Sequence, residues 1–247
     1  MKYLAKIKYL GTDFHGFQVQ PEKRTVQGEL CAALEKTLGV PCLVTGSSRT
    51  DAGVHANEFV ITVSAEGATV PPERLPLAAA RFLPPDIAVF HAEECDENFH
   101  PRYAAKSKEY LYLIENKKVA DPFLHGRTWF LPRIISENGI ILMREASKHI
   151  IGSHDFSAFM ADGSDVKDTR RDVKYLTVEK TDGLIKIHIC ADGFLYNMVR
   201  IIVGTLTEVA FGRFKPSDIA DIINSRVRKN AGPTAPPEGL YLNKVNY

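Results

Sequence analysis

The sequence predicts an α+β protein built from two ferredoxin-like units, each with the element order β-α-β-β-α-β. Runs of alternating apolar and polar residues, typical of strands, are separated by runs with helical spacing. This order occurs twice along 247 residues, and an Asp-Gly pair predicts a hairpin in the second half. We expect units over residues 1–103 and 104–247, side by side, forming a mixed, mainly antiparallel sheet with a central cleft.

The first unit is predicted to begin with a half-buried strand over residues 2–9, whose alternation puts one set of side chains on one face: Tyr3, Ala5, Ile7 and Tyr9. A loop over 11–24 precedes a helix that Thr25 caps and Gly39 ends. The remaining elements are strands over 42–45 and 59–63, a short helix from 71 to 83, and a strand over 87–92.

The second unit repeats this order. We expect a strand around residues 109–114, a helix over 136–151, and hairpin strands over 173–178 and 185–189 about Asp182-Gly183. Two helices, over about 194–210 and 216–225, and a strand over 240–245 complete it.

Composition excludes several classes of function. Lys and Arg total 31 against 30 Asp and Glu, so the net charge of +1 creates no overall field for nucleic acid, and local basic clusters must provide any such binding. The four cysteines and eight histidines show no metal-ligand spacing. No apolar run reaches membrane-spanning length, so we expect a cytoplasmic protein with free thiols, no metal and no membrane contact.

The segment 46–56, Gly-Ser-Ser-Arg-Thr-Asp-Ala-Gly-Val-His-Ala, is the strongest candidate for a reactive site. It places Arg49, Asp51 and His55 within seven residues, between two predicted strands, where binding and catalytic groups are often found. Residue type and spacing alone favour an ordinary polar hairpin turn with a solvated Asp51, because Asp, Gly, Ser and Thr are the common residues of such turns. His55 either orients a neighbour or contacts phosphate, or it is a turn residue satisfied by backbone.

Two features of the second unit extend this hypothesis. Arg200 lies in a helix that is apolar nearly all round, so it must reach solvent or meet a carboxylate; an ordinary surface arginine is the alternative. Tyr110 and Tyr112 share a strand face after a run of basic residues, an arrangement that suits stacking on an extruded base. Half-buried packing is the alternative for both tyrosines.

Several motifs, in order along almost the whole chain, resemble the TruA family of tRNA pseudouridine synthases. The central one is Arg-Thr-Asp-Ala-Gly-Val-His-Ala at 49–56. The others lie at 9–20 (Tyr-x-Gly-Thr-x-Phe-x-Gly-Phe-Gln), 99–112, 152–159, 193–206 (with Asn-Met-Val-Arg) and 234–242 (Thr-Ala-Pro-Pro-Glu-Gly-Leu-Tyr-Leu). One departure is Ser48, where the family often has Gly.

The resemblance implies isomerisation of uridine to pseudouridine at positions 38, 39 and 40 of the tRNA anticodon stem-loop, without metal or organic cofactor. It also implies a homodimer whose subunits share one tRNA. By position, Asp51 corresponds to the catalytic nucleophile, Arg49 and Arg200 to its ionic neighbours, and Tyr110 to the aromatic residue that stacks on the flipped-out target base.

The chemistry fits those residue types. The reaction breaks the N1–C1′ bond, turns the uracil and rejoins it through C5, so one ionised carboxylate beside C1′ suffices. A guanidinium nearby keeps that carboxylate charged in a dry pocket. Two other classes remain open: a non-catalytic RNA-binding protein of two RRM-like units, and a metal-dependent hydrolase using Asp51 and His55.

Overall fold

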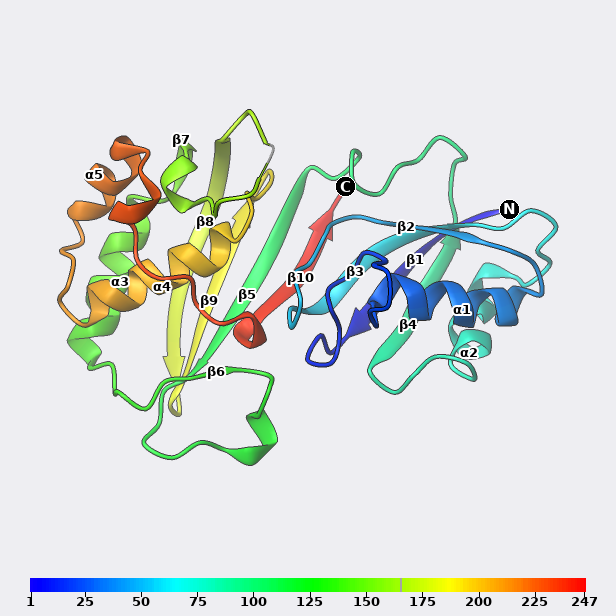
Figure 1. Cartoon of the computed structure of the whole chain (residues 1–247), viewed down its shortest axis with the longest axis horizontal. Coiled ribbons are helices and arrows are strands. Elements are labelled where there is room, and N and C mark those ends of the chain that lie inside the picture. Colours follow the sequence, from blue (N-terminus) through cyan, green and yellow to red (C-terminus); the bar gives the residue numbers. More distant parts are fainter. Residues whose placement is uncertain (165) are drawn as a thin grey trace. The chain divides into compact units, whose positions relative to one another are not determined.

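The computed structural model describes residues 1–164 and 166–247. It confirms an α+β protein with mixed, mainly antiparallel strand pairing. The chain forms two compact units, Met1–Lys106 with Tyr241–Tyr247, and Ser107–Leu240 (Figure 1). The first break lies three residues from the predicted boundary, but the C-terminal segment belongs to the first unit, whereas the sequence placed it in the second.

The first unit has the predicted ferredoxin-like order. Its elements are β1 (Lys2–Tyr9), α1 (Val26–Leu38), β2 (Leu43–Gly46), β3 (His55–Ser64), the 3₁₀ turn Pro72–Arg74, α2 (Leu75–Ala79) and β4 (Ile87–Glu94). The sheet order is β4-β1-β3-β2, with every neighbouring pair antiparallel. The helices α1 and α2 lie together on one face of this sheet (Figure 1).

Local signals explain α1. The Thr25 hydroxyl accepts a hydrogen bond from the Gly28 N–H at 3.3 Å, and Gly39 ends the helix with a left-handed φ of 71°. The residues at helical spacing, Val26, Leu30, Ala33 and Leu34, are all buried. By contrast, α2 is shorter than the predicted helix over 71–83: residues 72–74 form a 3₁₀ turn, and the helix ends at Ala79.

The C-terminal strand β10 (Leu240–Asn246) explains how the last residues join the first unit. Tyr241 and Leu242 pair in parallel with His55 and Ala56 at the start of β3. Beyond this pairing, Asn57 donates to the Asn243 side chain at 2.8 Å. Choice of partner strand depends on tertiary contacts, which the alternation within residues 240–245 does not encode.

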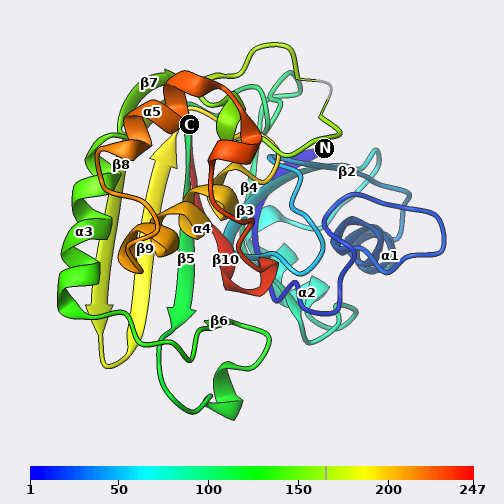
Figure 2. The ribbon, with the colours of Figure 1, turned by 60° about the vertical axis from the view of Figure 1, so that its left-hand side comes forward.

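The second unit contains β5 (Ser107–Glu115), β6 (Trp129–Phe130), α3 (Glu137–Lys148), β7 (Gly152–Asp155), β8 (Arg170–Thr181), β9 (Leu184–Ala191), α4 (Met198–Ala210) and α5 (Asp218–Ser225). Its strands run in the order β5-β9-β8-β7, all antiparallel, with β6 parallel to β5. The predicted hairpin turn is confirmed, with Asp182 and Gly183 both at positive φ. Figure 2 shows α3 and α4 in front of these strands.

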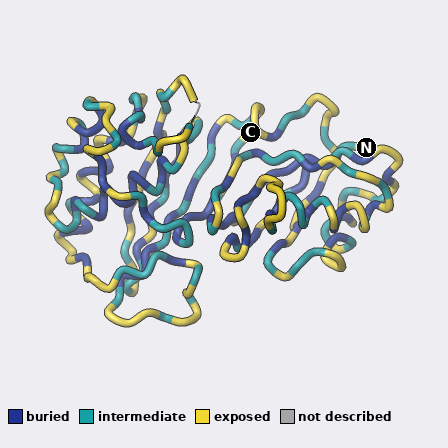
Figure 3. Tube along the Cα trace, viewed as in Figure 1, coloured by how far each residue is buried: buried dark blue, intermediate teal, exposed yellow. Residues whose placement is uncertain are grey.

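The helix α4 begins at Met198, four residues later than predicted, because Asn197 adopts a left-handed conformation with φ 58°. Ten of its thirteen residues are buried, as its apolar sequence indicated. A Cβ on Gly204 would lie 1.8 Å from the Pro233 carbonyl oxygen, so the backbone of residues 231–236 crosses directly over the helix. In each unit the buried residues follow the strands and the inner sides of the helices (Figure 3).

Candidate active site

The candidate loop joins β2 to β3 and is shorter than the sequence suggested, since β3 starts at His55 rather than at the predicted residue 59. It therefore covers residues 47–54. Ser47 is fully buried, and its N–H donates to the Val60 carbonyl at 2.9 Å. Thr50 and Val54 are also buried. The loop is thus anchored to the sheet rather than extended into solvent.

A second segment, residues 11–17, is hydrogen-bonded to the backbone of this loop. The Phe17 N–H donates to the Thr50 carbonyl at 3.2 Å, and the Gly53 N–H donates to the Phe14 carbonyl at 3.2 Å. The Phe17 ring stacks on Phe59 of β3, with centroids 4.4 Å apart. The sequence predicted only a connecting loop here, but the segment supports the candidate loop through these contacts.

Two glycines make this close approach possible. A Cβ on Gly11 would lie 2.0 Å from the Val54 carbonyl oxygen, and one on Gly16, which has a φ of 88°, would lie 2.6 Å from the Thr50 carbonyl oxygen. Any side chain would push the segment away from the loop. These contacts explain the glycines of the motif at 9–20.

His55 is completely buried, and its Nδ1 accepts a hydrogen bond from the Gly11 N–H at 2.8 Å. Its ring lies 4.5 Å, centroid to centroid, from the Tyr241 ring. Because Nδ1 acts as an acceptor, the neutral imidazole carries its proton on Nε2. Of the two alternatives for His55, the structure supports the residue satisfied by backbone, which ties the loop to residues 11–17.

Asp51 occupies the part of the loop whose backbone is fixed on both sides. The preceding residue, Thr50, accepts through its carbonyl from Phe17, and its hydroxyl shares a hydrogen bond of 2.8 Å with the Tyr9 hydroxyl. The Asp51 carbonyl accepts from the Val54 N–H at 3.2 Å. Asp51 is half-buried and Arg49 is exposed. The structure thus fixes the backbone of Asp51 by hydrogen bonds and leaves the residue partly exposed on the first unit.

Tyr110 lies on β5 in the second unit and is 7% exposed. Its ring meets Phe194 edge to face, with centroids 5.0 Å apart. Tyr112, two residues along, is a core residue: its hydroxyl donates to the Pro236 carbonyl at 2.6 Å, and burial raises its pKa far above the usual value. The packing alternative therefore holds for Tyr112.

Arg200 is half-buried on α4. Its Nε donates to the Ala235 carbonyl at 2.7 Å, and its Nη1 donates to the Asn197 side-chain oxygen at 2.7 Å. The Ala235 N–H in turn donates to the Arg200 carbonyl at 3.0 Å. These bonds offset the desolvation of the guanidinium. They also connect the motifs at 193–206 and 234–242, which the sequence separates by almost thirty residues.

The four predicted site residues therefore fall into two groups, Arg49 and Asp51 in the first unit and Tyr110 and Arg200 in the second. Spacing alone did not identify the residues that hold them. The glycine-rich motif at 9–20 could have indicated Gly11 and Gly16, since glycine is often required where backbones meet. The Asn-Met-Val-Arg motif, at i and i+3, contained the signal for Asn197.

Over residues 1–164 and 166–247, no group of three or more His, Cys, Asp or Glu side chains is arranged to hold a metal ion. Within the same residues, no helix is long and apolar enough to cross a membrane. The cysteines are free thiols, and burial raises the pKa of Cys42 to about 11.

Comparison with known proteins identifies the class. A family model described as tRNA pseudouridine synthase matches residues 5–104 and 146–247, so the chain is an isomerase of the pseudouridine synthase class. Proteins named tRNA pseudouridine synthase A are 45% identical in Thermoanaerobacter sp. (strain X514), 42% in Acetivibrio thermocellus and 44% in Moorella thermoacetica. Each alignment covers 98% of this chain and 97% of the relative.

The chain belongs to the TruA family of tRNA pseudouridine synthases, as its motifs predicted. This membership decides against the RRM-like and hydrolase hypotheses. Among solved structures, a chain of a Cbf5-Nop10-Gar1 complex aligns with 92% of this chain and 69% of its own, at 14% identity and a TM-score of 0.36.

Proposed function

We propose that this enzyme isomerises uridine at positions 38, 39 and 40 of the tRNA anticodon stem-loop, as a cytoplasmic homodimer, with Asp51 as nucleophile. The observation that supports Asp51 most directly is its fixed backbone, held between Thr50, Phe17 and Val54. A catalytic carboxylate must keep its position within a fraction of an ångström as bonds change. An ordinary solvated turn has no need for such an anchor.

In the proposed reaction the target nucleotide is flipped out of the stem-loop, because a stacked uridine cannot present C1′ to a side chain. The ionised Asp51 carboxylate bonds to C1′ as the N1–C1′ bond breaks and uracil leaves as an anion. The base turns, C5 bonds to C1′ while the bond from Asp51 to C1′ breaks, and the proton lost from C5 is balanced by one gained at N1. No atom is added, so water must be kept out to avoid an abasic site.

The other three residues have supporting roles in this proposal. Arg49 and Arg200 favour the ionised form of Asp51 and attract phosphate, since a nearby guanidinium opposes the effect of desolvation. Tyr110 stacks on the detached uracil and keeps it near C1′ while it turns. The edge-to-face contact with Phe194 fixes the Tyr110 ring before substrate arrives.

Tritium release tests the chemistry. With tRNA labelled at C5 of uridine, the wild type should release label without added metal, and Asp51→Asn should abolish release while tRNA binding changes little. Normal turnover by Asp51→Asn would refute its assignment as nucleophile. Tyr110→Phe should fold and bind tRNA like the wild type, because the ring remains; Tyr110→Ala should lose roughly tenfold or more in rate.

Transcripts with single uridines at positions 38, 39 or 40 test the site assignment, and label release from uridines elsewhere in the tRNA would contradict it. Sedimentation equilibrium tests the homodimer. A mass corresponding to one chain at working concentration would overturn that part of the proposal.

A further inference from the structure

The segment between β5 and α3, residues 116–135, carries two large apolar side chains in water. Phe123 is 84% exposed and Val119 is 80% exposed. Figure 1 shows this segment, drawn in green, leaving the end of β5 and extending beyond the strands of the second unit. We call residues 117–127 the Phe123 loop. An exposed phenylalanine at this point adds nothing to the core.

The Phe123 loop is built to hold its shape. At its base, Asn116 is 3% exposed; its side-chain nitrogen donates to the Leu131 and Arg133 carbonyls, both at 2.9 Å, and its oxygen accepts from the Ile135 N–H at 2.8 Å. These three bonds join the start of the segment, Asn116, to its end at residues 131–135. The loop that carries the exposed Phe123 ring is therefore hydrogen-bonded at its base.

The tip is ordered by two carboxylates. The Glu115 side chain, 1% exposed, accepts from the Asp121 N–H at 2.7 Å, and the Asp121 side chain accepts from the Phe123 N–H at 2.9 Å. The second bond caps the 3₁₀ turn Pro122–Leu124, which carries the ring. Glu115 at the end of β5 and Asp121 in the loop thus each hold a backbone N–H of the loop.

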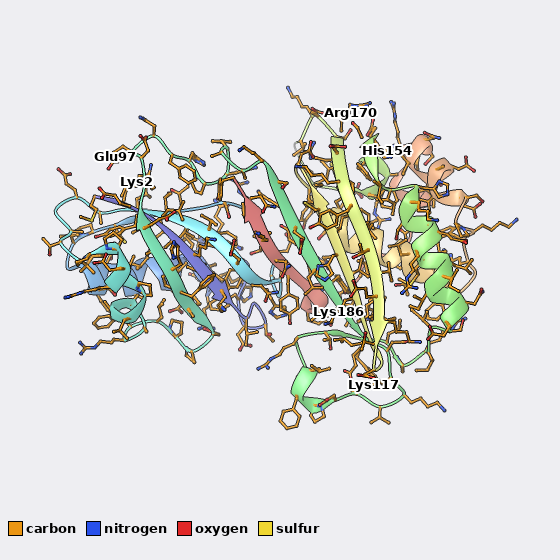
Figure 4. The ribbon with its side chains drawn as sticks, turned by 180° about the vertical axis from the view of Figure 1, so that it is seen from behind. Lys2, Glu97, Lys117, His154, Arg170 and Lys186 are labelled. Carbon is orange, nitrogen blue, oxygen red and sulfur yellow. The ribbon has the colours of Figure 1, made fainter. Side chains whose placement is uncertain are left out.

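The basic side chains of the loop outnumber its one acidic side chain, Asp121. Lys118 and Arg127 are exposed, and Lys117 lies over the β8–β9 turn, where a Cβ on Gly183 would be 2.8 Å from its Cγ. Figure 4 shows Lys117 at the ends of β8 and β9. Cations beside an exposed aromatic ring suit a nucleic acid, which offers phosphates and base faces together. An acidic or apolar protein partner would use only one of these features.

We propose that the Phe123 loop is a second contact with the tRNA substrate, in which Phe123 packs on a base or ribose and Lys117 and Lys118 meet phosphates. This inference rests on the tRNA substrate of the proposed function. It assigns the loop to affinity and not to the chemical step, because none of these side chains belongs to the candidate active site.

Equilibrium binding of a fluorescently labelled tRNA transcript tests the aromatic contact. Phe123→Ala should weaken affinity at least about fivefold, the lower end of what stacking on one base provides, while Phe123→Trp retains it. Leu77→Ala is the matched control, since Leu77 is 82% exposed but lies on α2 in the first unit. The tRNA affinity of Leu77→Ala should equal that of the wild type. The melting temperatures of all three variants should lie within a few degrees of the wild-type value.

The double variant Lys117→Gln/Lys118→Gln tests the interaction with phosphates. The slope of log affinity against log salt should become shallower by about 0.7 to 0.9 for each phosphate that the protein no longer neutralises. With saturating tRNA, the single-turnover rate should remain that of the wild type.

Three results would overturn the proposal: Phe123→Ala binding tRNA as tightly as Leu77→Ala; an unchanged salt slope in the double variant; or a changed sedimentation mass in Phe123→Ala with unchanged tRNA affinity, which would assign the loop to contact between copies of the chain. Failure of the wild type to bind tRNA would remove the proposed function as well. If the wild type forms pseudouridine and Phe123→Ala binds tRNA with unchanged affinity, only the assignment of the loop is wrong.

Discussion

The side-chain oxygen of Asn197 accepts a hydrogen bond from Nη1 of Arg200 at 2.7 Å, and Asn197 adopts a left-handed backbone conformation immediately before α4. Residues other than glycine seldom adopt this conformation, although asparagine tolerates it better than most. Asn197 therefore both accommodates the backbone turn before α4 and holds the guanidinium through its side-chain oxygen. Asn197 is a positioning residue for Arg200.

Two substitutions separate these contributions. Asn197→Gly keeps the left-handed backbone and removes the acceptor, so we expect stability within about 1 kcal/mol of the wild type but a several-fold slower single-turnover rate. Asn197→Ala should in addition lose about 1 kcal/mol of stability, because alanine tolerates a positive φ less well than asparagine or glycine. Urea unfolding and single-turnover kinetics provide the two measurements. Wild-type turnover in Asn197→Gly would show that Arg200 does not depend on this bond.

Substitutions at two glycines test whether residues 11–17 support the candidate loop. Gly16 and Gly39 both have positive φ, but a Cβ on Gly16 would meet the Thr50 carbonyl oxygen at 2.6 Å, whereas a Cβ on Gly39 would meet nothing within 4 Å. We expect Gly39→Ala to cost about 1 kcal/mol of stability and leave turnover intact. Gly16→Ala should lose more stability and at least tenfold in turnover, because the backbone beside Asp51 must move.

Thermal unfolding and tritium release measure these two effects. The hypothesis that residues 11–17 support the loop would be wrong if both variants lost stability equally and kept full activity.

His55 and Gly11 predict a stability difference. His55→Ala leaves the Gly11 N–H buried without its 2.8 Å acceptor, at a cost of about 1 to 3 kcal/mol in addition to the cavity. His55→Asn places an amide oxygen near the same position and should recover part of that loss. Urea unfolding of the two variants gives the comparison, and equal stabilities would show that the acceptor contributes little.

The environment of Asp155 makes the stability of the fold depend on pH. Burial tends to raise its pKa, but hydrogen bonds from Thr169 and Ser157 and the charge of Arg226 outweigh burial and lower it. A carboxyl group with a lowered folded-state pKa stabilises the fold above its unfolded-state pKa of about 4, and this contribution disappears as pH falls through the folded value.

We therefore expect Asp155→Asn to be less stable than the wild type by about 1 kcal/mol at pH 7, with the difference shrinking below about pH 4. Urea unfolding at a series of pH values measures it. A difference that stayed constant down to pH 3 would contradict the assignment.

Much of the fold follows from local signals in the sequence. Thr25 and Gly39 mark the ends of α1, and Asp182-Gly183 marks the hairpin, because caps and tight turns are decided by neighbouring residues. The beginning of β3 at His55 was missed, since its pairing with β10 involves residues almost two hundred positions away. The same distance hid the membership of residues 241–247 in the first unit.

The candidate site shows the same division. Residue types and motifs identified Asp51, Arg49, Tyr110 and Arg200 as candidates, but not what holds them. The N–H of Gly11 on His55, the carbonyl of Ala235 on Arg200 and the Phe194 ring on Tyr110 are contacts between distant segments. No spacing rule predicts such contacts, because each depends on how the finished elements pack.

The parallel pairing of β10 with β3 sets the order in which parts of the first unit can fold during synthesis. While a ribosome is still making residues 241–246, the edge of β3 next to His55 lacks its final neighbour, and the Tyr241 ring is not yet available to cover the imidazole. A nascent chain can form α1 and the antiparallel strands early. The turn that carries Asp51 acquires this support only when residues 241 and 242 have been synthesised.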